Sequence, residues 1–272
     1  MEFEDENKLH TLLLNKLNPW WNNNRPKIQS FHRADYDFIK TLIQKERSVS
    51  ILGPRQVGKT TLVKQLINDL LQTIPGERIL YADLGDKELL SLTKDPMQDV
   101  LQIYRKNVLN EDLSTLKDNI WLFFDEVQKD AEWAETVKSY IDHYPHMKVI
   151  TTGSSSLRLS RKTKETLPGR AAMQIMLPLK FADFARIRKT IQPDLPDGDA
   201  LRSFGKEMRN YFTQSLEAKN FEPLETFCND SANYFLPFES EAQTMIQKYL
   251  QVGGYHEEVL EPDASRRNRL LL

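Results

Sequence analysis

The sequence predicts an α/β fold of the P-loop NTPase class, and two segments lead to this prediction. Residues 53–60 read Gly-Pro-Arg-Gln-Val-Gly-Lys-Thr, which fills every fixed position of a phosphate-binding loop, the P-loop. Residues 120–126 read Ile-Trp-Leu-Phe-Phe-Asp-Glu, an apolar run that ends in two carboxylates. Continuous apolarity is typical of a strand in a parallel sheet that helices cover on both faces.

The segments on either side of the P-loop have the character that this motif requires. Ser48–Leu52 is short, apolar and β-branched, as expected for a buried strand. The alternative, an ordinary glycine turn before a helix, leaves the complete motif and its strand–loop–helix context unexplained. After the loop, helical spacing predicts an amphipathic helix with one apolar face formed by Leu62, Val63, Leu66, Ile67, Leu70 and Leu71.

The P-loop residues have complementary roles in phosphate binding. Gly53 and Gly58 let the backbone curl so that its N–H groups point at phosphate oxygens, and the next helix adds partial positive charge at its N-terminus. The Lys59 ammonium reaches the β- and γ-phosphates, and the Thr60 hydroxyl can ligate Mg²⁺. We therefore expect a nucleoside triphosphate site made of Gly53, Pro54, Arg55, Gln56, Val57, Gly58, Lys59, Thr60 and Thr61.

The two carboxylates at the end of the second segment call for a charged partner, because acids at the end of a buried strand are costly to desolvate. Asp125 fits the Walker B role of holding Mg²⁺ opposite Thr60. Glu126 fits the catalytic base that orients and polarises the attacking water. Solvated acids that cap the next helix are the alternative interpretation.

ATP is the expected nucleotide. The guanine-reading pattern Asn-Lys-x-Asp does not occur, and Asn15–Asn18 precedes the P-loop and lacks the aspartate. A further strand at Arg78–Asp83 between the two motifs, with a glutamate beside Asp125, indicates the ATP-hydrolysing branch of P-loop proteins. A small-molecule kinase would rarely carry this Asp-Glu pair.

Two more strands complete a predicted five-stranded sheet. Met147–Thr152 leads into Gly153–Ser156, and its tip is expected beside the P-loop, where a hydroxyl can contact the γ-phosphate. Ser154 is the first candidate for this sensor and Thr152 the second; a serine-rich turn that caps the next helix is the alternative. The fifth strand is expected at Gln174–Pro178.

Beyond the fifth strand the sequence predicts helices at Phe181–Ile191, Leu201–Leu216 and Glu239–Leu250. We expect three regions, which are an N-terminal extension over residues 1–30, the P-loop ATPase core over 31–180 and a helical lid over 181–272. Another helix should follow Pro96, and one should begin at Trp133, whose apolar face core packing explains.

Composition is that of an ordinary globular protein of 272 residues, with 40% hydrophobic and 28% charged residues. A net charge of −2 gives no overall attraction to nucleic acid or to an anionic membrane. Cys228, the single cysteine, excludes an intramolecular disulfide and suits a reducing cytoplasm. With no apolar stretch of about 18 residues and an acidic N-terminus at Met1–Glu6, we expect no membrane span and no signal peptide.

Several further matches occur in order along the chain, in the blocks Gly53–Leu62, Phe124–Lys129 with Trp133, Thr152–Ser156, Leu167–Arg170, Leu177–Phe181 and Val252–Glu257. Taken together, these blocks resemble the prokaryotic AAA+ ATPases of the AAA_14 type over roughly residues 30–260. His256 stands where proline is usual and Lys180 where serine is common, and neither belongs to the nucleotide motifs.

The resemblance implies a core sheet in the order 5-1-4-3-2, a helical lid, and an active site at a subunit boundary of a homo-oligomer. It also raises Arg170 as an arginine finger or sensor, with a solvated basic face or a structural salt bridge as the alternative. Relatives usually continue into a further C-terminal domain, often nuclease-like, so we expect a short member or a truncated chain ending at Leu272.

Partners are less defined by the sequence than the nucleotide is. A basic run at Arg158–Lys164 is a candidate for nucleic-acid phosphates, although most such runs are solvated. Trp20 and Trp21 cannot both face one core, so one is expected on the sheet and the other at the adenine pocket or a partner surface. Arg55 is a candidate for the nucleotide, a neighbouring subunit or a surface ion pair.

The sequence therefore predicts a Mg²⁺-dependent ATPase that couples its nucleotide state to remodelling or recruitment of a partner. Glu126, Lys59, Arg170 and Ser154 are the expected catalytic residues. A slowly hydrolysing nucleotide-gated switch is the first alternative, because it shares these motifs. The ATPase module of a nucleic-acid processing protein is the second.

Overall fold

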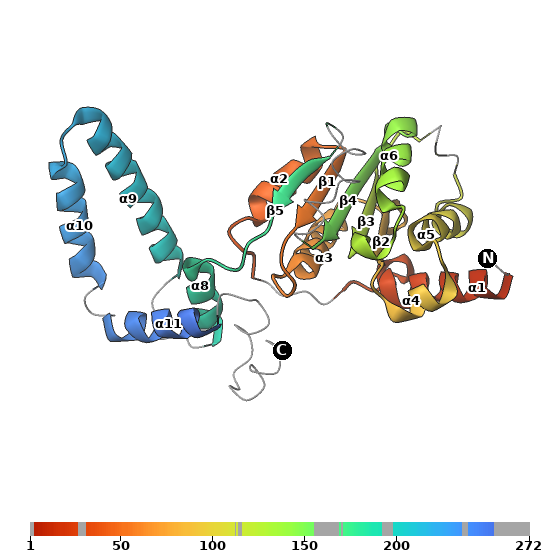
Figure 1. Ribbon diagram of the computed structural model, residues 1–272, viewed down its shortest axis with the longest axis horizontal. Helices are drawn as coiled ribbons and strands as arrows, with labels where there is room; N and C mark the ends of the chain where they lie inside the picture. The colour runs from red at the N-terminus through yellow and green to blue at the C-terminus, as the bar shows by residue number, and fades with distance from the viewer. Residues whose placement is uncertain are drawn as a thin grey trace. The chain divides into compact units, whose positions relative to one another are not determined.

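The computed structural model describes residues 3–26, 31–111, 113, 116–154, 169, 171–191, 198–235 and 239–252. The chain divides into two compact units, Met1–Leu177 and Pro178–Leu272. The first unit contains the sheet, and the second contains the helices from α8 (Phe181–Ile191) to α11 (Glu239–Val252) (Figure 1).

A five-stranded sheet forms the centre of the first unit, with the strands in the order β2-β3-β4-β1-β5 (Figure 1). All four pairings are parallel. The expected order 5-1-4-3-2 is therefore confirmed. The strands are β1 (Ser48–Leu52), β2 (Ile79–Asp83), β3 (Ile120–Asp125), β4 (Met147–Gly153) and β5 (Ala172–Ile175).

The central strands are buried along their whole length, and apolar or β-branched residues dominate their sequences. Every residue of β1, β3 and β4 is buried. The edge strand β5 is only partly buried and begins two residues earlier than the expected Gln174–Pro178. Its pairing with β1 continues one residue further, because the Met176 N–H donates to Leu52 O at 2.7 Å.

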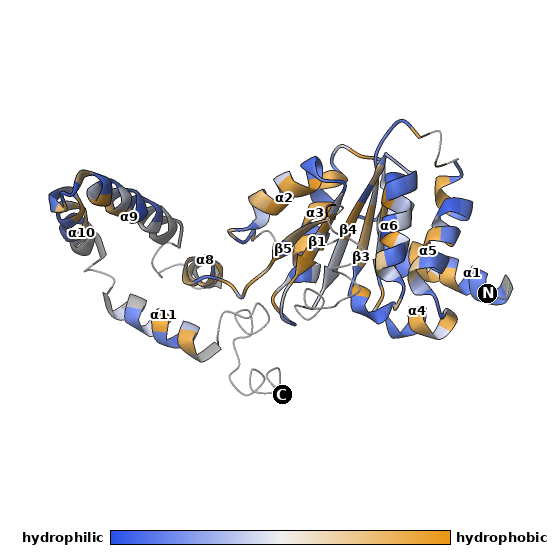
Figure 2. Ribbon diagram, turned by 45° about the horizontal axis from the view of Figure 1, so that its top comes forward, coloured by the Kyte–Doolittle hydropathy of each residue, from blue (hydrophilic) through white to orange (hydrophobic). Residues whose placement is uncertain are grey.

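Helices cover both faces of the sheet. The connection from β1 to β2 crosses the sheet in one direction, and the connections from β2 to β3 and from β3 to β4 cross it in the opposite direction. Because such crossovers are right-handed, α3 lies on one face of the sheet, and α5 and α6 lie on the other (Figure 2). Figure 2 also shows the hydrophobic residues gathered along the strands. These helices, with α2 which precedes β1, are α2 (Tyr36–Lys45), α3 (Lys59–Leu70), α5 (Pro96–Tyr104) and α6 (Trp133–His143).

Helix α3 buries the face that its sequence spacing predicts, since Leu62, Val63, Leu66, Ile67 and Leu70 are all in the core. Trp133 begins α6 and is buried together with Val137, Tyr140 and Ile141, which confirms the core-packing interpretation. The remaining elements of this unit are α1 (Phe3–Leu12), η1 (Leu13–Leu17), η2 (Pro19–Asn22), η3 (Gly76–Arg78), α4 (Lys87–Leu92), η4 (Arg105–Leu109) and η5 (Val127–Lys129).

The N-terminal segment covers the free edge of β2. The buried Asn18 side chain donates to Tyr81 O at 3.0 Å and accepts from the Tyr81 N–H at 2.6 Å, as a neighbouring strand would. Trp20 and Trp21 both donate their indole N–H to Ile79 O, at 3.1 and 3.0 Å. Both tryptophans therefore belong to the β2 edge, and β2 stands three places from the P-loop strand β1 in the sheet.

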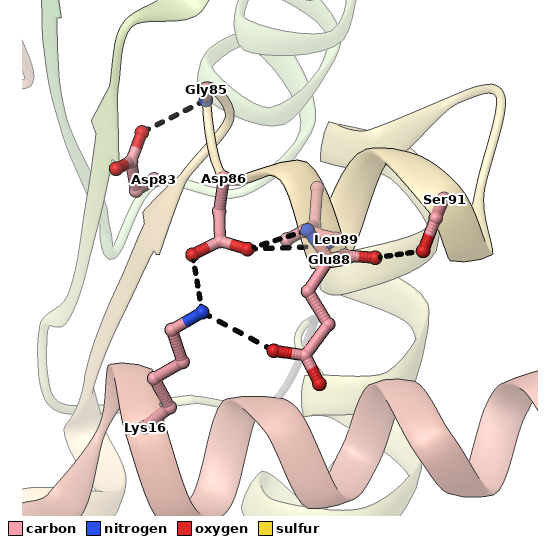
Figure 3. Close-up of polar contacts among 7 residues, drawn as sticks. All are labelled: Lys16, Asp83, Gly85, Asp86, Glu88, Leu89 and Ser91. Atoms are coloured by element: carbon pink, nitrogen blue, oxygen red, sulfur yellow. Dashed lines mark hydrogen bonds and ion pairs between the residues drawn. The ribbon is translucent and has the colours of Figure 1, made fainter.

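An ion-paired lysine of the N-terminal segment also contacts the loop and helix that follow β2 (Figure 3). The Lys16 ammonium lies 2.8 Å from the Asp86 carboxylate and 3.2 Å from Glu88. Asp86 also caps α4 by accepting from the N–H groups of Glu88 and Leu89. The first residues of the chain thus pack as part of the P-loop unit.

The second unit contains α8 (Phe181–Ile191), α9 (Gly198–Ala218), α10 (Glu222–Phe235) and α11 (Glu239–Val252). Helices α9 and α10 lie side by side, and the rings of Tyr211 and Phe227 stack between them with centroids 4.7 Å apart (Figure 1). The Tyr249 hydroxyl donates to Leu179 O at 2.9 Å and so joins α11 to the start of α8. Within the ranges described, none of the helices combines the length and apolarity that crossing a membrane requires.

Candidate nucleotide site

The P-loop occupies the turn between β1 and α3, and its backbone adopts the left-handed conformation at two positions. Gln56 has φ 61° and Gly58 has φ 92°. Gly53 has a different constraint, because a Cβ atom at this position would lie 2.3 Å from the Met176 carbonyl oxygen of the neighbouring chain segment. The loop therefore needs glycine at Gly53 for close backbone approach and at Gly58 for conformation.

The N-terminus of α3 faces this loop without a side-chain cap. Its first-turn N–H groups have no carbonyl four residues earlier within the helix, so they carry the positive end of the helix dipole. The Lys59 ammonium donates to Gly53 O at 3.0 Å and to Pro54 O at 2.8 Å. Burial lowers the pKa of Lys59, and the nearby carboxylates of Glu126 and Asp125 oppose that shift. Backbone donors and a cation thus converge on the loop.

Asp125, at the end of β3, meets the first turn of α3. Its Oδ2 accepts from the Thr60 hydroxyl at 2.5 Å and from the Tyr81 hydroxyl at 3.2 Å. Its Oδ1 accepts from the Thr152 hydroxyl of β4. Asp125 is only 1% exposed, so these donors hold a buried carboxylate in one orientation where β1, β3 and β4 end.

Glu126 follows directly and has an unusual backbone, with φ 55° in the left-handed region. A non-glycine residue in this region is uncommon, and such positions often occur at functional sites. The Glu126 N–H donates to Thr152 Oγ1 at 3.2 Å, and its carboxylate accepts from the Gln128 side-chain amide. The turn after β3 thus places the Glu126 carboxylate at the Gln128 amide and within electrostatic reach of the Lys59 ammonium.

The acidic character of this edge extends to Asp83 at the end of β2, which pairs in register with Asp125. Burial raises the pKa of Asp83, and Asp125, Asp86 and Glu126 raise it further. The Gly85 N–H donates to Asp83 Oδ1 at 2.8 Å, and this hydrogen bond lowers the pKa of Asp83 (Figure 3). The acidic side chains at the ends of β2 and β3 therefore lie close enough to affect the ionisation of Asp83.

Arg33 supports the P-loop from outside and is not predicted from the sequence. Its guanidinium donates to Val57 O at 3.0 Å and to Leu177 O at 2.7 Å, and it pairs with Asp35 at 3.1 Å. Arg33 is 7% exposed. In the sequence, Arg33 is simply a basic residue before α2, and nothing there distinguishes it from an arginine exposed to solvent. Tyr81, Asn18 and Gln128 are likewise found only in the structure.

The structure places the other expected site residues as follows. Thr152 is buried against Asp125, whereas Ser154 is half-buried just beyond the end of β4. Arg55 and Gln56 are exposed at the tip of the P-loop. Three features lie outside the described residues, namely Arg170, the basic run Arg158–Lys164 and the residues from 253 onward.

A glycine loop between β1 and α3, an acidic strand end beside it and this strand order define a P-loop protein of the AAA type. The chain matches the AAA_14 family, described as an AAA domain, over residues 45–185, which is more than half of its length. The protein therefore belongs to the AAA_14 family. Membership of an AAA family supports ATP binding.

Two archaeal relatives, both uncharacterized proteins of Methanocaldococcus jannaschii, show similarity in sequence. MJ1637 is 26% identical over 196 residues, which span 68% of this chain and 40% of that protein. MJ1544 is 29% identical over 138 residues, which span 51% of this chain and 28% of that protein. The chain thus spans less than half the length of these relatives. Among solved structures, this chain is similar to the Walker-type ATPase PABY2304 of Pyrococcus abyssi, with a TM-score of 0.42 and 16% sequence identity. The match covers 85% of this chain and 82% of that protein.

Proposed function

We propose that the protein binds ATP in the P-loop and hydrolyses it to ADP and phosphate with Mg²⁺ as cofactor. One observation carries this proposal. The Thr60 hydroxyl lies 2.5 Å from Asp125 Oδ2, and Glu126 is the next residue along the chain. A metal-ligating hydroxyl, a metal-ligating carboxylate and a candidate base therefore meet where phosphate is expected.

The P-loop supplies the binding energy for the triphosphate. The backbone donors of the loop and of the uncapped first turn of α3 are available to the phosphate oxygens. The Lys59 ammonium contacts two loop carbonyls, and charged phosphate oxygens are stronger partners for it than neutral carbonyls are. ATP binding should therefore transfer Lys59 from the loop carbonyls to the β- and γ-phosphates.

Thr60 and Asp125 fit a Mg²⁺ ion, because hydroxyl and carboxylate oxygens are the hard ligands that this ion prefers. Asp125 is buried and forms no ion pair within the part of the chain that the structure describes, so a cation would compensate its charge. When bound, Mg²⁺ neutralises charge on the phosphate oxygens.

Glu126 is the proposed base. It accepts a proton from water while the water oxygen forms a bond to the γ-phosphorus. The bond between the γ-phosphorus and the β,γ-bridging oxygen breaks, and ADP leaves with that electron pair. Ser154, close to the end of β4, is the proposed γ-phosphate sensor, with Thr152 as the second choice. Arg170 is proposed to complete the site from a neighbouring subunit, and for Arg170 the support is the sequence alone.

The proposed use of this cycle is the remodelling or recruitment of a partner by a homo-oligomer. The resemblance of the sequence to AAA+ ATPases is the ground for this part of the proposal. The partner itself, whether protein or nucleic acid, is to be found by testing which added polymer stimulates ATP turnover.

Phosphate release by the purified chain with Mg²⁺-ATP tests the proposal. We expect turnover that EDTA abolishes and that Glu126→Gln lowers about 10²-fold or more while ATP still binds, because glutamine keeps the size of the side chain but cannot take the proton. Glu46→Gln is the matched control, since Glu46 is exposed at the end of α2. Turnover of Glu126→Gln near the wild-type rate would remove Glu126 from the chemistry and favour a slow nucleotide-gated switch.

A further inference from the structure

The Gln128 side chain bridges two parts of the candidate site that belong to different strands. Its Nε2 donates to the Glu126 carboxylate, at the end of β3. Its Oε1 accepts from the Ser154 N–H at 3.3 Å, just beyond the end of β4. One amide thus connects the proposed base to the segment proposed to sense the γ-phosphate.

The chemistry of the two neighbours settles the orientation of this amide. A backbone N–H can only donate, so the amide oxygen must face Ser154. An ionised carboxylate can only accept, so the amide NH₂ must face Glu126. Both ends of Gln128 are therefore matched to their partners, and neither contact would survive reversal of the amide.

The turn that carries Gln128 does not depend on this side chain. Backbone bonds close the turn, from Lys129 N to Glu126 O at 3.0 Å and from Asp130 N to Val127 O at 3.1 Å. Val127 is fully buried and anchors the turn in the core. Because these contacts already hold the backbone, the Gln128 amide is available to orient Glu126.

We propose that Gln128 is a positioning residue for ATP hydrolysis, which holds the Glu126 carboxylate at the site of the attacking water and links its position to the β4 tip at Ser154. Glu126 is half-buried and stands on a left-handed backbone, and a glutamate side chain has several rotatable bonds. A directed hydrogen bond to the carboxylate removes part of this freedom before the reaction, which is the contribution of orientation to catalysis. The inference rests on the proposed function of Glu126.

Gln128→Met and Gln128→Glu test this role. Methionine has similar length but no amide, and glutamate keeps the shape but faces Glu126 with a second negative charge. We expect kcat to fall about tenfold or more in both, with a larger fall for Gln128→Glu, while the Kd for ATP stays within about twofold because the P-loop is unchanged. Gln98→Met, at an exposed position of α5, is the control and should leave kcat unchanged.

A double-mutant cycle separates positioning from a general structural effect. If Gln128 acts through Glu126, Gln128→Met should lower the residual turnover of Glu126→Gln by less than about twofold, so that the two losses are far from additive. Additive losses, an unchanged kcat in Gln128→Met, or a loss of ATP affinity as large as the loss of kcat would each overturn the inference. Failure of Glu126→Gln to lower turnover would instead refute the role of Glu126 as the base, which is the part of the proposed function on which this inference rests.

Discussion

Asn18→Ala should destabilise the P-loop unit by about 3 kcal/mol, because Asn18 replaces a missing strand at the edge of the sheet. Asn18 is 0% exposed and forms side-chain hydrogen bonds to Leu13 O at 3.1 Å and to both backbone groups of Tyr81, at 3.0 and 2.6 Å. Leu13 O keeps a partner in the variant, because the backbone N–H of residue 18 also donates to it, at 2.8 Å. The Tyr81 N–H and C=O are left without partners, and each such buried group costs roughly 1–3 kcal/mol.

Denaturant unfolding followed by tryptophan fluorescence measures this loss in one unit. All four tryptophans, at positions 20, 21, 121 and 133, belong to Met1–Leu177, so the signal is independent of the helical unit. Asn24→Ala, at an exposed position of the same segment, is the matched control and should change the free energy of unfolding by less than about 0.5 kcal/mol. A loss below about 1 kcal/mol in Asn18→Ala would refute the view that this side chain completes the edge of β2.

Three other substitutions test separate parts of the account. Gly53→Ala should lower the free energy of unfolding of the P-loop unit by about 1–3 kcal/mol, because the new Cβ atom would lie 2.3 Å from Met176 O. Gly205→Ala in α9 is the control, since a Cβ atom there has nothing within 4 Å and should not destabilise the protein. Unfolding by denaturant compares the two variants. Arg170→Ala should cut hydrolysis about 10²-fold with ATP affinity within a few-fold, and mixing it with Glu126→Gln should restore part of the activity if the arginine acts across a subunit boundary. A strictly monomeric protein at saturating ATP, with no rescue on mixing, would contradict that arrangement. Asp83→Asn should raise the free energy of unfolding at neutral pH without Mg²⁺, because the pKa of Asp83 is raised in the folded protein and its ionised form therefore destabilises the fold. In acid the Asp83 carboxyl is protonated in both the folded and the unfolded protein, so the gain from asparagine should shrink. A gain that grows in acid would contradict this.

The nucleotide motifs and the sheet could be predicted from the sequence because their signals are local. The P-loop is a continuous motif, and apolar or β-branched residues dominate the buried strands β1, β3 and β4. The helix from Leu201 to Leu216 is also present and extends to Gly198–Ala218. The strand order 5-1-4-3-2 could be expected only through the family resemblance.

Other features depend on contacts between distant residues, and the sequence does not contain them in readable form. Asn18 and Tyr81 are 63 positions apart, and Arg33 and Leu177 are 144 apart. The four helices α1, α2, α4 and α10 were not predicted, because their sequences are short, mixed in polarity or both, and packing decides whether such segments become helical. Gln128 stands within a recognised block, yet only the fold shows that its amide reaches both Glu126 and Ser154.

Calorimetric titration of Lys59→Ala with Mg²⁺-ATP tests the central claim, that this P-loop binds the triphosphate, most directly. Lys59 is the cation whose ammonium lies among the loop carbonyls, so its loss should weaken ATP binding at least roughly tenfold, about 1.4 kcal/mol, in a protein that remains folded. Lys45→Ala removes an equal charge at an exposed position of α2 and should leave the affinity unchanged. Equal ATP affinity in wild type and folded Lys59→Ala would contradict the assignment of the nucleotide site.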